Sequence, residues 1–217
     1  GVEDGNAMGN TVTMNGGTVD ELACGAVTDR GDATGNTVTL NAGTVKQSLN
    51  GGYASVGNAT GNTVTMNGGT VDNWLCGGYT GKGNATGNTV TMKDGTAKTF
   101  LYGGFSNKGN ATGNTVTLND GTVYYIYGGA AVTGNATGNT VTMNGGTVEK
   151  YLDGGNTTTG NAAGNTVTVN AGTITVFIAG GDVDVTGNAS GNMVTINGGT
   201  LAGIYGGYVH GTGDASG

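Results

Sequence analysis

The residues that could act in catalysis are few in this chain of 217 residues. A nucleophilic triad needs a histidine beside its nucleophile. The one histidine, His210, lies in a glycine-rich segment and has no serine or cysteine partner in the sequence pattern. Asp94 and Asp120 occupy equivalent repeat positions and could share a proton or a cation. Each precedes a glycine, however, and Asp-Gly is ordinary turn chemistry, so we expect no catalytic residue and no enzyme.

A second acidic group could bind a metal ion. Asp153, Asp182 and Asp184 gather near the longest loop, and Ca²⁺ prefers several oxygen ligands. The alternative is a solvated acidic loop. We favour the alternative, and therefore expect neither a resident metal nor a cofactor.

The charge balance restricts the partners of the chain. It has 7 Lys and Arg against 14 Asp and Glu, a formal net charge of −7. A nucleic acid needs a basic protein face, so we do not expect it as a partner. The sequence has no run of about 18 apolar residues, and we expect no membrane insertion of this segment.

A repeat of about 26 residues organises the whole chain. The segment Gly-Asn-Thr-Val-Thr recurs, and its spacing is 25 to 27 residues. The Gly-Asn pairs begin at Gly9, Gly35, Gly61, Gly87, Gly113, Gly138, Gly164 and Gly191. A typical unit runs from Gly57 to Lys82, and we expect one repeat domain over residues 1–217.

The unit predicts strands and turns rather than helices. Thr63 to Met66 alternates with period two, as a strand does. Asn67 to Gly69 is a turn, and Thr70 to Leu75 predicts a second strand that ends at Gly77-Gly78. The remainder suits a loop or a short third strand. Glycine accounts for 49 residues, which penalises any helix.

So short a unit cannot bury its own apolar face and must stack on its copies. We therefore predict an all-β, single-domain parallel β-solenoid of about eight coils, right-handed as parallel crossovers usually are. Its core should consist of four apolar ladders, which contain Val64, Met66, Val71 and Leu75 with their equivalents as far as Ile204. Asn62 and its equivalents should form a hydrogen-bonded ladder that holds a tight bend.

The predicted stacking also separates the two cysteines. Cys24 and Cys76 occupy the same place two coils apart, with Asn50 between them. Two rungs place their Cα atoms roughly 9.6 Å apart, beyond the reach of a disulfide. We expect two free thiols.

Aromatic residues recur at one position and predict a contact surface. Each directly precedes an inward aliphatic residue, so strand alternation should turn it outward. The stripe consists of Trp74, Phe100, Tyr125, Tyr151 and Phe177, with Tyr102 and Tyr127 two residues further along on the same face. It could stack on sugar rings or pack against another rod. The alternative is mutual stacking that only stabilises the solenoid.

Threonine pairs form a second surface pattern. A threonine flanks the inward valine on each side, which predicts a flat outward array that resembles those of ice-binding solenoids. The array includes Thr37, Thr39, Thr63, Thr65, Thr89, Thr91, Thr115, Thr117, Thr140 and Thr142. Outward threonine is also what β-propensity favours on any such strand, so ice binding is the alternative hypothesis.

Units such as GNATGNTVTMNGGTV followed by GGY resemble the strand-loop-strand repeats of bacterial autotransporter passengers and related surface adhesins. The resemblance implies an extracellular β-helical stalk at the bacterial cell surface, part of a longer repetitive protein. Its expected role is structural and adhesive, as the shaft of an adhesin or fibre. Expected partners are neighbouring repeats, copies of itself, a glycan, or a host or bacterial surface protein.

Overall fold

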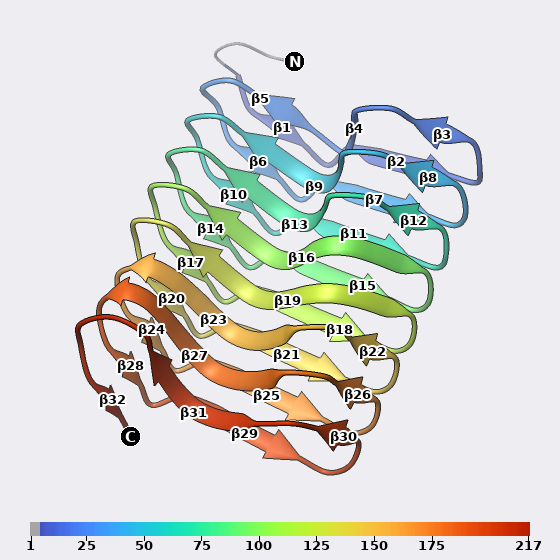
Figure 1. Ribbon diagram of the computed structural model, residues 1–217. Coiled ribbons are helices and arrows are strands. Elements are labelled where there is room, and N and C mark those ends of the chain that lie inside the picture. Colours follow the sequence, from blue (N-terminus) through green and yellow to red (C-terminus); the bar gives the residue numbers. More distant parts are fainter. Residues whose placement is uncertain (1–4) are drawn as a thin grey trace.

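The chain forms a parallel β-solenoid, as the sequence predicts (Figure 1). The computed structural model describes residues 5–217, and all the regular structure in that range is β-strand. Successive coils stack along one axis, and each strand pairs in parallel with its equivalent one coil away. Three sheets therefore run the length of the molecule.

The first sheet contains nine two-residue strands that follow the loop of each coil. They are β1 (Ala7–Met8), β6 (Ala33–Thr34), β10 (Ala59–Thr60), β14 (Ala85–Thr86), β17 (Ala111–Thr112), β20 (Ala136–Thr137), β24 (Ala162–Ala163), β28 (Ala189–Ser190) and β32 (Ala215–Ser216). This is the short third strand that the sequence analysis gave as one of two alternatives, the other being a loop. The alanines of its inner coils, such as Ala59 and Ala85, are fully buried.

The second sheet contains the Thr-Val-Thr strands. They are β2 (Thr11–Met14), β7 (Thr37–Leu40), β11 (Thr63–Met66), β15 (Thr89–Met92), β18 (Thr115–Leu118), β21 (Thr140–Met143), β25 (Thr166–Val169) and β29 (Met193–Ile196). In the inner coils the valine and the fourth residue are buried while both threonines are half-exposed, which confirms the predicted inside and outside.

The third sheet combines short and long strands. The short ones are β3 (Thr18–Val19), β8 (Thr44–Val45), β12 (Thr70–Val71), β22 (Thr147–Val148), β26 (Thr173–Ile174) and β30 (Thr200–Leu201). The others are β4 (Leu22–Cys24), β5 (Val27–Thr28), β9 (Ser48–Ala54), β13 (Trp74–Thr80), β16 (Thr96–Ser106), β19 (Thr122–Ala131), β23 (Tyr151–Thr159), β27 (Phe177–Thr186) and β31 (Ile204–Val209).

The predicted second strand is wrong in its bounds. It breaks after Val71 and resumes at Trp74, and it continues through Gly77-Gly78 instead of ending there. The glycines are needed because the backbone passes close to its neighbours. A Cβ at Gly77 would lie 2.3 Å from the carbonyl oxygen of Gly103, and one at Gly78 would lie 2.4 Å from Oδ1 of Asn88.

The glycine pair also reverses the alternation of the strand. Residues five apart point to opposite faces of a regular strand, yet the rings of Trp74 and Tyr79 lie 5.5 Å apart. Leu75 and Thr80, which flank the pair on the other face, are both fully buried. The strand therefore bends at Gly77-Gly78, and Trp74 and Tyr79 meet on the concave side of the bend.

The four apolar ladders form one continuous core, as predicted. An exception is Ile204, which is 46% exposed and pairs with Ile178 at the edge of the third sheet. The asparagine ladder is also confirmed. Asn62 donates through Nδ2 to Oδ1 of Asn88 at 2.9 Å and to the carbonyl oxygen of Ala33 at 2.9 Å.

Candidate functional site

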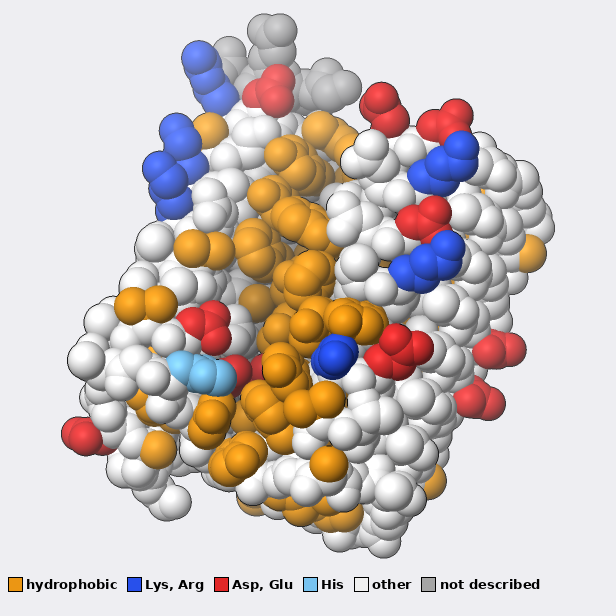
Figure 2. All heavy atoms as spheres, viewed as in Figure 1, with side chains coloured by type: hydrophobic (Ala, Val, Ile, Leu, Met, Phe, Trp, Pro, Cys, Tyr) orange, Lys and Arg blue, Asp and Glu red, His pale blue; other side chains and the backbone are white. Residues whose placement is uncertain are grey.

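The concave side of the long strands forms a groove along the solenoid. Figure 2 shows it as a band of apolar side chains between two mostly polar ridges. Three files of side chains line it, because the bend turns three positions of each long strand to this side. We call it the aromatic groove.

The three files are defined by their strand register. The first is Leu22, Ser48, Trp74, Phe100, Tyr125, Tyr151 and Phe177. The second is Cys24, Asn50, Cys76, Tyr102, Tyr127, Asp153, Ala179 and Tyr205. The third is Val27, Tyr53, Tyr79, Phe105, Ala130, Asn156, Asp182 and Tyr208.

The predicted aromatic stripe is the first file, and its members are half-buried. They stack from coil to coil, with ring centroids 5.1 Å apart for Phe100 and Tyr125 and 4.2 Å apart for Tyr151 and Phe177. Tyr102 lies beneath its neighbours and is only 6% exposed, so little of it is available for a contact. The aromatic rings therefore stabilise one another and also form the floor of the groove.

The sequence analysis missed the third file. Tyr53, Tyr79 and Phe105 continue the aromatic surface, with ring centroids 4.9 and 5.2 Å apart. Their signal was the aromatic residue directly after Gly51-Gly52, Gly77-Gly78 and Gly103-Gly104. It was not used because the glycines were expected to end the strand.

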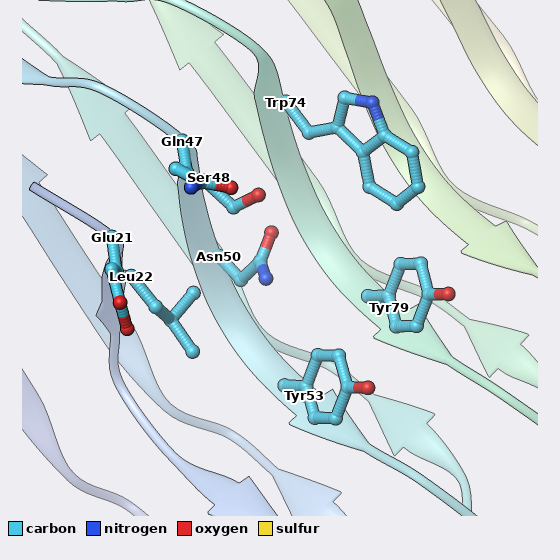
Figure 3. A pocket seen from close by; sticks show the side chains of 8 residues that line it. All are labelled: Glu21, Leu22, Gln47, Ser48, Asn50, Tyr53, Trp74 and Tyr79. Carbon is cyan, nitrogen blue, oxygen red and sulfur yellow. The ribbon is translucent and has the colours of Figure 1, made fainter.

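The groove widens into a hollow of about 380 Å³ near its N-terminal end (Figure 3). Its lining combines aromatic and polar side chains: Glu21, Leu22, Gln47, Ser48, Asn50, Tyr53, Trp74 and Tyr79. In Figure 3 the Asn50 amide points into the space between Leu22 on one side and the rings of Trp74 and Tyr79 on the other.

Asn50 is the unusual residue of this hollow. It is 2% exposed, and its Oδ1 has no hydrogen-bond partner among the described residues. A buried acceptor without a partner costs free energy. A ligand that donates a hydrogen bond to this oxygen would remove that cost, which favours its binding. The hollow thus offers ring faces for apolar contact and a few convergent polar groups, which is typical of small-molecule sites.

The opposite end of the groove is acidic. Asp153 on β23 is fully buried, and its carboxylate has no side-chain hydrogen-bond partner among the described residues. Burial raises the pKa of Asp153 well above its usual range, and the charge of Asp182 raises it further. Burial also raises the pKa of Asp182, although the nearby His210 opposes the shift.

The expectation of a solvated acidic loop is wrong for this group. Asp153, Asp182 and Asp184 lie on strands β23 and β27, and the first two are buried. By contrast, Asp94 and Asp120 are exposed, and each accepts a hydrogen bond from the amide of the next glycine, at 2.6 and 2.8 Å. Their interpretation as turn residues fits this geometry.

The predicted threonine array lies on the second sheet, outside the groove. Thr63 pairs with Thr37 and Thr89, and Thr65 with Thr39 and Thr91, so two files run in register across the strands. The threonine file that contains Thr63 is interrupted at Met193, which is 55% exposed.

Comparison of the chain with family models, curated proteins and solved structures gave no match. Within residues 5–217, none of the secondary structure is a helix that could cross a membrane. The evidence on function therefore comes from the geometry of the groove and of the threonine face.

Proposed function

We propose that the chain is a non-catalytic repeat domain of a bacterial surface adhesin or fibre, and that its aromatic groove binds a glycan. The observation that carries the proposal is the hollow beside Trp74, where aromatic faces lie beside the unpartnered amide oxygen of Asn50. Sugar rings present an apolar face and hydroxyl donors at their edges, and this lining can contact both.

The shape of the groove favours an extended ligand. The first aromatic file covers five successive coils from Trp74 to Phe177, which is about 19 Å at the usual strand spacing. A chain of several sugar units could follow this floor. The repeat resemblance supports an extracellular location, with neighbouring repeats or further copies of the chain as partners in a fibre.

The test is a glycan array with the whole chain, followed by calorimetry on any ligand found. Trp74→Ala and Asn50→Ala should each weaken binding at least tenfold. The control is Asn144→Ala, because Asn144 is an exposed amide outside the three files. An array without binding, or a ligand whose affinity both groove variants retain, would contradict the proposal.

Ice binding is the second candidate function, and the in-register threonine files favour it. A flat array of regularly spaced hydroxyl and methyl groups suits an ordered water lattice. If this face acts, the protein should show thermal hysteresis, and Thr91→Tyr should abolish it while the melting temperature stays unchanged. Absence of thermal hysteresis at millimolar protein would reject this candidate.

A further inference from the structure

Three potential metal ligands converge at the C-terminal end of the groove. A carboxylate oxygen of Asp182, one of Asp184 and a ring nitrogen of His210 all lie within 4.8 Å of one another. The backbone fixes this arrangement, since the His210 amide donates to the carbonyl oxygen of Val183 at 2.9 Å. The single histidine of the chain is thereby held against the acidic end of β27, and Figure 2 shows red carboxylates on both sides of the pale blue ring.

The bonding of Asp182 is incomplete. The residue is 3% exposed, and its Oδ1 makes a long ion pair with Nε2 of His210, at 3.3 Å, and no hydrogen bond of good geometry. A good charge-assisted hydrogen bond is shorter, at about 2.7–2.9 Å. The buried oxygen is therefore compensated only by this long contact to the histidine.

A second buried carboxylate nearby is also unsatisfied. Asp153 is completely buried, and its carboxylate has no side-chain hydrogen-bond partner among the described residues. Burying unpaired carboxylates is expensive unless a cation or hydrogen bonds compensate. A bound cation would compensate the buried carboxylate of Asp182 more closely than the long contact to His210 does.

We propose that Asp182, Asp184 and His210 bind a divalent transition-metal ion, with Zn²⁺ as the best fit. Imidazole nitrogen suits zinc and its neighbours, whereas Ca²⁺ and Mg²⁺ take oxygen ligands. Two ligands about 2.1 Å from a tetrahedral ion stand about 3.4 Å apart, close to the 3.3 Å between Asp182 and His210. Three protein ligands leave a fourth position for water or for a group of a bound ligand.

The surroundings support this choice. Asn156 pairs with Asp182 in the strand register, and its side chain lies within hydrogen-bonding reach of the Asp182 carboxylate. Outer groups of this kind orient metal ligands. The site is independent of glycan binding in the hollow, which lies on the first three coils.

The test is calorimetry of the whole chain, stripped with a chelator, against ZnCl₂, with CaCl₂ and MgCl₂ as comparison ions. We expect one Zn²⁺ per chain and at least tenfold weaker binding of the other two ions. Asp182→Asn and His210→Ala should each weaken Zn²⁺ binding at least tenfold. Asp120→Asn, which alters an exposed turn carboxylate, should leave it unchanged.

A second readout separates loss of ligands from loss of fold. The circular dichroism of both variants should remain that of the parent, and the thermal shift caused by Zn²⁺ should appear in the parent and disappear in both. No Zn²⁺ binding, binding that both variants retain, or equal binding of Ca²⁺ that survives His210→Ala would each overturn the proposal.

Discussion

Asparagine side chains link the coils at the scale of single residues. Asn139 is fully buried. Its Oδ1 accepts from the amide and from Nδ2 of Asn114, both at 3.0 Å, and its own Nδ2 donates to Ala111 at 3.0 Å and to Asn165 at 2.9 Å. One side chain thus satisfies buried polar groups on the coils before and after it.

This network predicts that Asn139→Ala lowers the stability of the protein strongly. The substitution leaves several buried donors and acceptors unpaired, each costing about 1–3 kcal/mol, so we expect the free energy of unfolding to fall by about 3 kcal/mol or more. Asn144→Ala is the control in the same coil, because Asn144 is exposed and should cost under about 1 kcal/mol. Urea denaturation measures both, and equal losses would contradict a special role of the buried ladder.

The two cysteines give a second prediction at this scale. Both are free, and burial raises the pKa of each thiol to about 12. A raised pKa disfavours the thiolate, which is the reactive form. At pH 8 both thiols should therefore react with Ellman's reagent about a thousandfold more slowly in the folded protein than in urea. Fast reaction before unfolding, or fewer than two thiols in urea without reductant, would contradict the prediction.

Residue-level features were predictable where they depend on the repeat alone. The separation of Cys24 from Cys76 and the stacking of the asparagines follow from the 26-residue period. The hollow did not follow from it, because Tyr79 reaches Trp74 only through the reversal at Gly77-Gly78. Close approach of backbone to side chain, as at Gly78, depends on neighbouring coils and leaves no local pattern.

At the scale of elements, each β-strand of the second sheet has one buried face and one solvent-exposed face. The prediction is that Val116→Asp destabilises the protein far more than Thr117→Asp. Val116 has no exposed surface and belongs to the core, so a buried charge should cost several kcal/mol. Thr117 is half-exposed and should cost under about 1 kcal/mol. Thermal melts compare the two variants, and equal melting temperatures would mean that the faces are assigned wrongly.

Small differences in coil length are absorbed as register shifts within the long strands. Ala97 pairs with Val123 but Phe100 pairs with Tyr125, so the coil with one residue fewer loses it within β19, between Val123 and Tyr125. The coil with one residue more takes it up between Val183 and Thr186. The spacing of Gly-Asn pairs showed that these coils differ by one residue, but not where. The place of the insertion or deletion depends on which part of the coil can change its length without displacing a core ladder.

At the scale of the whole molecule, one scaffold carries a groove whose lining changes along the axis. The hollow lies on the first three coils, stacked aromatics follow, and the unpartnered carboxylates lie near the C-terminal end. The main chain repeats almost unchanged beneath them, because the ladders fix it. Differences along the groove therefore depend mainly on the three side chains that each coil contributes to its files, and on neighbours such as Glu21 and His210.

This separation of scaffold and groove predicts that a whole coil can be removed. Deleting residues 83–108 joins Lys82 to Gly109, which begins the equivalent coil, so Val64 would pair with Val116 and Asn62 with Asn114. Each repeat contacts only its neighbours, and the shortened chain should keep its β-sheet circular dichroism and lose only part of its stability. The control deletion, residues 83–95, removes half a coil and places polar loop residues opposite core ladders, so this chain should fail to fold. If both deletions fold, or if neither does, the stability of the molecule does not reside in the register of whole coils.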